Sequence, residues 1–346
     1  MTVQPDSPAA PTAVVTGAAG WLGQNLVRRL ARERERVRCL VAGEDDASLL
    51  AVISPSVETV AGDVRDPATA DRLFDGVRDA AVFHAAAVIH PRTTRGFFDV
   101  NVGGTQMVID RARRAGAMRF VHVSSNSPFG VNPTPGHVFT EDSPYNPYLG
   151  YGQSKLEAEE IVRRTHERGD LATVIVRAPW FYGPYQPPRQ TRFFSAIRKG
   201  RFPLVGDGSQ RRSMVYIDNL VQGLLRAEVA DKAPGNAYWI ADARPYELRE
   251  IIATVRQALV DEGLTVRGDT ELRLPRVAAR MAERADAALQ RRGRYHQALH
   301  VLGELNHTIA CDISRARDEI GYEPTVELRE GMRASIRWCL EHGENL

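Results

Sequence analysis

The sequence predicts an α/β protein with a doubly wound parallel sheet and a smaller, discontinuous lobe toward the C-terminus. Short β-branched runs alternate with helical patterns through the first half, which is typical of a parallel α/β sheet. A glycine-rich turn follows the first of these runs directly, and the alternation ends after Ala178. The 346 residues are long for one compact core and suit one large domain with a smaller lobe.

Six strands are predicted in the first half, each a short run of β-branched or apolar residues. They are Ala13–Thr16, Val37–Val41, Val57–Ala61, Ala81–His84, Phe120–Ser124 and Thr173–Arg177. Between the first two, leucines recur every four residues at Leu22, Leu26 and Leu30, so this segment is predicted to be an amphipathic helix.

Less regular pieces follow the sixth strand. Residues 178–188, "APWFYGPYQPP", are rich in proline, glycine and aromatic residues and are predicted to be a loop that leaves the sheet. "SMVYIDNLVQGLLRA" predicts a strand running into a helix, "NAYWIA" a further strand, residues 276–292 an arginine-rich helix, and the last segment a turn followed by a helix. We therefore predict a large domain of residues 1–182, to which 214–242 return, and a smaller lobe formed by 183–213 and 243–346.

Composition excludes several classes of function. Lys and Arg total 45 against 43 Asp and Glu, so no strong field favours nucleic acid or an anionic membrane. The three cysteines, Cys39, Cys311 and Cys339, form no CxxC pair, which argues against a disulfide framework and a metal site. No signal peptide and no bilayer-spanning run is found, so a cytoplasmic protein without a membrane partner is expected. The helix at 276–292 carries too thin an apolar stripe to bury in lipid.

The glycine-rich turn predicts a dinucleotide site. Gly17, Gly20 and Gly23 stand after a predicted strand and at the head of a predicted helix. In this context the first glycine permits the tight turn, the second lets the backbone approach a pyrophosphate, and the third lets the helix pack on the sheet. The helix N-terminus offers free N–H groups and a partial positive charge to the phosphates. The expected cofactor contacts here are Gly17, Ala19, Gly20, Trp21, Leu22 and Gly23.

Two later strand ends fit the same cofactor. Asp63 follows the third strand and is placed to accept from an adenine amino group, with Val64 contributing its backbone N–H. Ala85, Ala86 and Ala87 follow the fourth strand, where small side chains let the ribose and phosphates lie on the backbone. A purely turn-forming role for the Asp63 carboxylate agrees equally well with its position.

The end of the second strand leaves the choice between NAD and NADP open. An acid there would bind the ribose hydroxyls and an arginine would bind a 2′-phosphate, but Val41 and Ala42 do neither. Glu44 or Asp45 can reach back to the ribose, and Arg38 can serve a phosphate.

Tyr151 and Lys155 lie one helical turn apart in a chain that has only three lysines, so their side chains share a face. Hydride transfer at a carbinol needs a proton moved at its oxygen, which a tyrosine can do if a nearby cation lowers its pKa. The compact ammonium of lysine can also donate to a nicotinamide ribose, which a planar guanidinium does less well. Ser124 ends a predicted strand, and Ser125 and Ser127 follow it, at the edge of the sheet where ligands bind.

Taken together, these segments resemble the extended short-chain dehydrogenases/reductases of the NAD-dependent epimerase/dehydratase type. The resemblance covers almost the whole chain, and the order and spacing of its motifs are specific. The motifs are "TGAAGWLG" (16–23), "GDVRD" (62–66), "NVGGT" (101–105), "VSSNSPFG" (123–130), "YGQSK" (151–155), "RAPWFYGP" (177–184), "GDGSQRRSMVYIDNL" (206–220) and "ARDEIGYEP" (316–324).

This resemblance implies a Rossmann-type fold, NAD or NADP as cofactor, and a homodimer. It makes Tyr151 the general acid/base, Lys155 its electrostatic partner and Ser125 the hydroxyl that orients the substrate. Asn101 resembles the helix asparagine that supports the catalytic network. Residues Pro179 to Tyr182 are expected near the nicotinamide.

The resemblance also implies a substrate site that includes Ser125, Asn126 and Arg212. Nucleotide-sugar members place an arginine at the position of Arg212, on the diphosphate or ribose. Because "RRSM" replaces the usual Arg-Asp-Phe, Arg211 could serve equally well. In 4,6-dehydratases an Asp-Glu pair follows the catalytic hydroxyl, but here Asn126 and Ser127 fill those places and neither is a proton donor of suitable pKa. That dehydration is therefore not expected.

The sequence is compatible with three functions. The first is an epimerase or oxidoreductase acting on a hydroxyl or ketone of a sugar, especially a nucleotide-sugar. The second is a 3β-hydroxysteroid-dehydrogenase-like or other ketone reductase with an apolar substrate, which "SMVYIDNLVQG" and the missing acid in "RRSM" favour. The third is a non-catalytic NAD(P)-binding sensor, against which the complete Ser-Tyr-Lys set argues.

Overall fold

Seven parallel strands form the central sheet of the computed structural model, which describes residues 8–267 and 272–346. The strand order is β11-β6-β5-β4-β1-β2-β3, and the predicted fold class is confirmed. The strands are β1 (Thr12–Thr16), β2 (Arg36–Val41), β3 (Val57–Ala61), β4 (Ala81–His84), β5 (Arg119–Ser125), β6 (Thr173–Ala178) and β11 (Ala237–Trp239). The six predicted strands are thus confirmed to within one residue, and β11 is the strand predicted in "NAYWIA".

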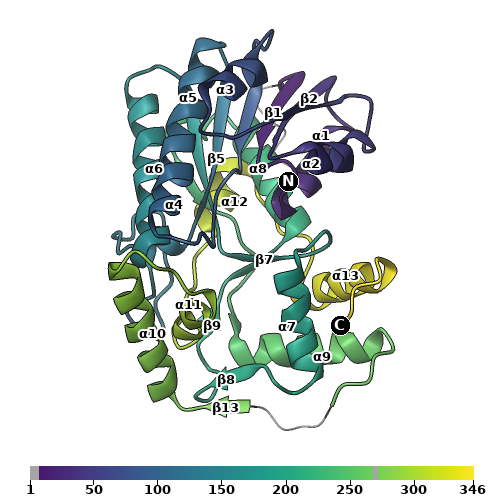
Figure 1. Cartoon of the computed structure of the whole chain (residues 1–346), viewed down its shortest axis with the longest axis vertical. Coiled ribbons are helices and arrows are strands. Elements are labelled where there is room, and N and C mark those ends of the chain that lie inside the picture. Colours follow the sequence, from purple (N-terminus) through teal and green to yellow (C-terminus); the bar gives the residue numbers. More distant parts are fainter. Residues whose placement is uncertain (1–7, 268–271) are drawn as a thin grey trace.

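Helices cover both faces of the sheet because the strand residues alternate between two apolar cores. Val14 packs in a core with Val108, on the side of α3 (Pro67–Phe74), α5 (Gly104–Arg114) and α6 (Leu149–Glu167). Val15 packs in the other core with Leu26 and Leu220, on the side of α1 (Trp21–Leu30), α2 (Glu44–Ala51) and α8 (Ile217–Val229). In Figure 1 this sheet and its helices form the upper half of the molecule.

A second lobe lies below the sheet in Figure 1. Its helices are α7 (Pro188–Arg198), α9 (Leu248–Asp261), α10 (Arg276–Arg291), α11 (Gln297–Glu304) and α13 (Leu328–Glu341). Its short strands pair as β8 (Pro203–Val205) with β13 (Leu272–Leu274), and β9 (Arg211–Arg212) with β12 (Tyr246–Glu247). The arginine-rich helix predicted at 276–292 is confirmed as α10.

The predicted loop at 178–188 needs one correction. Its residues Trp180–Tyr182 form a short strand, β7, paired in parallel with β10 (Met214–Tyr216) outside the central sheet. The pairing is stabilised by aromatic packing, because Tyr182 is fully buried against Tyr216. Among the described residues, no helix has the length and apolar character needed to cross a membrane.

Candidate active site

The glycine-rich turn has the geometry of a phosphate cradle. Gly17 has φ of +68°, and a Cβ there would lie 2.7 Å from the Ala86 nitrogen. A Cβ on Gly23 would lie 2.1 Å from the Gly17 carbonyl oxygen, so α1 approaches the turn closely. Gly20 caps α1 without a side chain, and the first turn of α1 holds no acid that would repel a phosphate. The N–H groups at this helix start are therefore free for an anion, and a pyrophosphate fits.

Trp21 contributes to this turn in two separate ways. Its indole N–H donates to the Pro184 carbonyl at 2.8 Å and its ring lies 4.8 Å from that of Phe181. Asn25 donates to the same carbonyl at 3.2 Å. The Trp21 side chain thus holds the segment after β7 against α1, while the Trp21 backbone belongs to the phosphate cradle.

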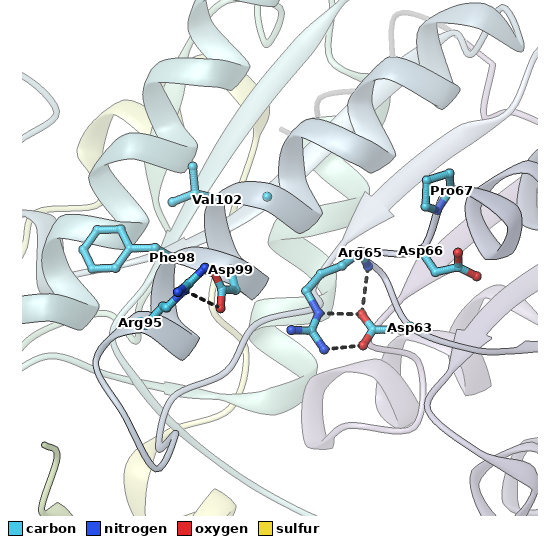
Figure 2. Close-up of a pocket in the computed structure, with 9 residues that line it drawn as sticks. Asp63, Arg65, Asp66, Pro67, Arg95, Phe98, Asp99 and Val102 are labelled. Carbon is cyan, nitrogen blue, oxygen red and sulfur yellow. Dashed lines mark hydrogen bonds and ion pairs between the residues drawn. The ribbon is translucent and has the colours of Figure 1, made fainter. Parts of the chain in front are cut away.

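An open cavity of about 740 Å³, shown in Figure 2, lies where the sequence predicts the adenine. Its lining residues are Asp63, Arg65, Asp66, Pro67, Arg95, Phe98, Asp99, Val102 and Gly103. The predicted contact Asp63 lies in it, but its carboxylate also accepts from the Arg65 side chain at 2.9 and 2.5 Å. These hydrogen bonds lower the pKa of Asp63. A carboxylate has further lone pairs, so an adenine amino group can still donate to it.

Acidic residues follow the end of β2, where the sequence predicts the cofactor ribose. Glu44, Asp45 and Asp46 form the first turn of α2, directly after the end of β2. The Arg38 guanidinium donates to the carbonyls of Asp75 and Arg72. Its service to a 2′-phosphate stays a prediction, as does that of Glu44 or Asp45 to the ribose.

His84, at the end of β4, joins the cradle to the helix that carries Asn101. Its Nδ1 lies 2.7 Å from the Thr16 hydroxyl and its Nε2 lies 3.0 Å from the Thr105 hydroxyl. The Thr105 hydroxyl donates to the Asn101 carbonyl at 2.6 Å. Ala85 and Ala86 follow His84 directly. The Ala85 N–H donates to the Thr16 carbonyl and the Ala86 N–H donates to the Thr16 hydroxyl, whereas Ala87 is exposed.

Helix α6, which carries Tyr151 and Lys155, is fixed to β6 by a buried ion pair. The Glu159 carboxylate is fully buried and lies 2.9 Å from the Arg177 guanidinium, which also stacks over Phe129. Arg163 adds a second contact to the same carboxylate at 2.9 Å. Removing one partner of such a pair typically costs about 3–5 kcal/mol, so the position of the helix is strongly constrained.

Tyr151 and Ser125 meet at the carboxyl end of β5. Burial raises the pKa of the Tyr151 phenol to about 12, while the nearby Ser125 hydroxyl acts in the opposite direction. The Ser125 hydroxyl also lies 3.2 Å from that of Ser127 and donates to the Asn126 side chain at 3.5 Å. The predicted set of Ser125, Asn126 and Tyr151 is thus brought together in space.

Lys155 lies next to this pair but its ammonium is directed into the protein. It is 2% exposed, and it donates to the Val123 carbonyl at 2.8 Å and to His122 Nε2 at 3.2 Å. Burial lowers its own pKa to about 8. The Arg189 charge of α7 also acts to lower the pKa of Tyr151, and the role of Lys155 as electrostatic partner of Tyr151 stays a prediction.

Asn101 lies in a π-helical segment, Phe98–Gly103, between α4 (Arg95–Phe97) and α5. Such segments inside helices frequently occur at functional sites. The Asn101 amide donates to the Ser154 hydroxyl at 3.0 Å and accepts from the Val88 N–H at 2.8 Å. Ser154 donates in turn to the Tyr151 carbonyl at 2.8 Å. Asn101 is therefore connected to the backbone of Tyr151 through the Ser154 hydroxyl.

Two further candidates, Tyr182 and Pro179, are buried in this structure. The hydroxyl of Tyr182 donates to the buried Asp242 at 2.8 Å, so only its backbone remains for a nicotinamide. Pro179 is likewise buried, at the exit of β6.

Arg212 is buried and interacts with a helix end. It is 7% exposed, and its guanidinium donates to the carbonyl of Glu304 in the last turn of α11, where cations are favoured. Its Nε has no hydrogen-bond partner among the described residues. Arg211 donates to the carbonyls of Pro135 and His137 instead.

The C-terminal lobe adds an aromatic wall beside Tyr151 that the sequence did not reveal. The ring of Phe97 lies 5.8 Å from that of Tyr151 and 5.5 Å from that of Tyr295, measured between centroids. The ring of Tyr295 lies 5.4 Å from that of His300. The Tyr295 hydroxyl also lies 2.8 Å from Nδ1 of His90. These residues come from segments about 200 positions apart, and no local pattern in either segment signals the contact.

His300 connects this wall to Asp286 of α10 and lies near Glu304 of its own helix, α11. Its Nδ1 lies 2.8 Å from the buried Asp286 carboxylate and its Nε2 lies 3.9 Å from Glu304. Burial lowers the pKa of His300, but the hydrogen bond to Asp286 and the two negative charges raise it above the ordinary value overall. A raised pKa in the folded state means that the contact stabilises the fold fully below about pH 6.5 and that this contribution is lost as the pH rises through the folded value.

We therefore expect the thermal unfolding midpoint of the wild type, relative to that of His300→Gln, to decrease as the pH is raised from 6 to 8. The glutamine variant keeps a polar side chain but cannot titrate. Scanning calorimetry of both proteins across this range measures the difference, which cancels contributions shared by the other histidines. Parallel curves for the two proteins would show that His300 binds no extra proton in the folded state.

Comparisons with known proteins agree with this geometry. The model of the NAD dependent epimerase/dehydratase family matches residues 13–241. An uncharacterized protein, y4nL, of Sinorhizobium fredii is 44% identical over 348 residues, covering 97% of both chains. The 4-hydroxy-2-methyl-3-oxo-4-farnesyl-3,4-dihydroquinoline-1-oxide ketoreductase of Stigmatella aurantiaca is 30% identical over 325 residues, covering 92% of this chain and 94% of the relative.

Among solved structures, the dTDP-glucose 4,6-dehydratase DesIV of Streptomyces venezuelae, with NAD and TYD bound, is similar in fold. It superimposes with a TM-score of 0.74 at 26% identity, covering 95% of this chain and 97% of that one.

Proposed function

The chain belongs to the NAD-dependent epimerase/dehydratase family of extended short-chain dehydrogenases/reductases, and from this we propose that it reduces a ring ketone to a carbinol with Tyr151 as the acid. The observation that carries the proposal is the pairing of Tyr151 with Ser125 at the carboxyl end of β5. When bound, the nicotinamide supplies the hydride. The residues of the chain bind the ketone oxygen, protonate it and shield it.

Each residue has a definite task in this reaction. Ser125 donates to the ketone oxygen and holds it beside the Tyr151 hydroxyl. Because burial raises the pKa of Tyr151 to about 12, the phenol carries its proton at neutral pH and can donate it as the oxygen gains negative charge. Arg189 stabilises the phenolate that remains, and Lys155 is held to donate to the cofactor ribose.

Two observations favour an apolar ring as the substrate. Phe97 and Tyr295 present an aromatic wall beside Tyr151, suited to a flat apolar skeleton. The Arg212 guanidinium, which would hold a diphosphate, is buried on the end of α11. The relative from Stigmatella aurantiaca, named as a ketoreductase of a farnesylated quinoline, supports the same class.

A nucleotide-sugar is the second candidate, favoured by one observation. The buried Arg212 Nε has no partner among the described residues, and a phosphate oxygen would provide one. The likeness to DesIV, whose structure contains NAD and TYD, is consistent with this candidate. An epimerase of this class would return its hydride to the same substrate and consume no external cofactor.

Transfer of a labelled hydride tests the proposal. The purified protein is incubated with NADH or NADPH deuterated at C4 and with ketones of two classes, prenylated or steroidal ring ketones and 4-keto nucleotide-sugars. We expect deuterium at the carbinol carbon of a ring ketone, and NADH to be preferred because α2 begins with three acids. Label only in the nucleotide-sugar would select the second candidate, and cofactor binding without transfer would indicate a sensor.

A further inference from the structure

Beneath the active site, two buried histidines that no catalytic step requires stack on each other. His84 of β4 and His122 of β5 are 1% and 0% exposed, and their rings lie 5.5 Å apart at 28°. His122 Nε2 lies 3.2 Å from the Lys155 ammonium, and its Nδ1 has no partner among the described residues. A buried nitrogen without a partner is costly, so its presence needs a reason.

The hydrogen bonds determine which nitrogen of each ring carries the proton. The Thr105 hydroxyl gives its hydrogen to the Asn101 carbonyl, so its oxygen accepts from Nε2–H of His84. His84 Nδ1 then accepts from the Thr16 hydroxyl. Because the Lys155 ammonium can only donate, His122 Nε2 is an acceptor and its proton resides on the unpartnered Nδ1.

A phenylalanine at position 122 would avoid the cost of an unpartnered buried nitrogen. Strand β5 already holds one such ring on the same face. Phe120 is fully buried on the same face of β5, two residues before His122, and its ring also lies near His84 at 5.7 Å. What His122 provides and phenylalanine lacks is therefore the lone pair on Nε2. That lone pair receives one of the three N–H groups of Lys155, and the Val123 carbonyl receives a second.

We propose that His122 is a positioning residue, which holds the Lys155 ammonium charged and oriented so that one N–H group remains for a ligand. This inference rests on the proposed function only for the identity of that ligand, the cofactor ribose. The stack continues through His84 to Thr16, the residue before Gly17, so the lysine and the phosphate cradle share one buried support.

The charge of Lys155 depends on the groups around it. On its own helix this is Glu159, one turn away; on β4 and β5 they are His84 and His122. Burial and the Lys155 charge keep the pKa of both histidines far below neutrality, so neither competes for the positive charge. Burial lowers the pKa of Lys155 to about 8, and the Glu159 charge opposes a further fall. The hydrogen bond from the ammonium to His122 Nε2 favours the same charged form, because a donor–acceptor contact of this kind is lost when the lysine is neutral.

The scarcity of lysine makes a direct test possible. The chain contains only Lys155, Lys199 and Lys232, so protein labelled with ¹³C at lysine Cε gives three NMR signals, and the two exposed lysines serve as internal references. In the ligand-free wild type we expect Lys155 to titrate near pH 8. In His122→Phe we expect this midpoint to fall by about one unit, the size of a lost hydrogen bond to a charged group.

Two matched variants separate positioning from packing. His122→Gln places an amide oxygen near the former Nε2 and should restore most of the midpoint. Phe120→Leu disturbs the same buried face without contacting Lys155, so it should lower the thermal midpoint but leave the titration unchanged. A Lys155 midpoint in His122→Phe equal to that of the wild type would overturn the proposal.

Nitrogen NMR of the wild type provides a check that needs no variant. Histidine labelled with ¹⁵N should show His122 as the Nδ1–H tautomer and His84 as the Nε2–H tautomer. The opposite tautomer at His122 would mean that Nε2 donates to a neutral lysine, which contradicts the proposal even if no variant folds. Both measurements use the ligand-free protein, so they can fail while the proposed reaction stands, and the reverse also holds.

Discussion

Replacing Tyr151 with phenylalanine is expected to lower turnover about 10²- to 10⁴-fold, the range in which general acid–base catalysis contributes. The change removes only the hydroxyl that protonates the substrate oxygen. The ring remains in contact with Phe97, and α6 remains fixed by the Glu159–Arg177 ion pair, so the fold should persist. Cofactor affinity should change little, because the cradle lies on other elements. Single-turnover kinetics and calorimetry with NADH measure the two quantities separately.

A second tyrosine provides the control. Tyr238 on the edge strand β11 is fully buried, and its hydroxyl donates to Glu319 and to the Lys232 carbonyl. Tyr238→Phe should therefore cost stability of about 1 kcal/mol but leave turnover unchanged, the reverse of the pattern at Tyr151. Unchanged turnover in Tyr151→Phe would remove this residue from the chemistry. A wild type that binds NADH and turns over no substrate would support the sensor.

The sequence predicted those parts of the molecule that depend on local pattern. Strands reveal themselves through short β-branched runs, and the glycine spacing after β1 requires a turn that only a few residue types can form. A serine hydroxyl near Tyr151 followed from the edge at which parallel strands end, whereas the choice of Ser125 followed from the family resemblance. Each of these predictions relied on residues close in sequence or on a rule of sheet topology.

The remaining parts of the site depend on contacts that no local pattern encodes. Tyr295 and His300 join the aromatic wall beside Tyr151 because the C-terminal lobe contacts the loop that carries His90. The π-helical turn at Asn101 has a sequence that gives no sign of departure from an ordinary α-helix. The Lys155 ammonium donates to His122. In the sequence His122 is simply part of a predicted buried strand, so nothing signals this contact.

The three glycines of the turn, equivalent by spacing alone, are expected to respond differently to substitution. Gly20 has an ordinary φ of −69°, and a Cβ there meets only the Gly17 carbonyl, at 3.1 Å. A Cβ at Gly23 would lie 2.1 and 2.5 Å from two backbone oxygens. Gly23→Ala should therefore destabilise the fold by about 1–3 kcal/mol or more, because backbone atoms must move. Gly17 combines a close backbone contact with a positive φ and should behave in the same way.

Gly20→Val, in contrast, should leave the protein folded and weaken cofactor binding at least about 100-fold, or about 2.7 kcal/mol. The branched side chain would stand where the pyrophosphate must approach the backbone at the start of α1. Calorimetry with NADH measures the affinity and thermal unfolding measures the fold. Gly136→Val is the matched control, because a Cβ there meets no atom within 4 Å. A folded Gly20→Val protein that binds NADH as tightly as Gly136→Val would show that the cofactor phosphates lie elsewhere, and the assignment of the turn would fail with it.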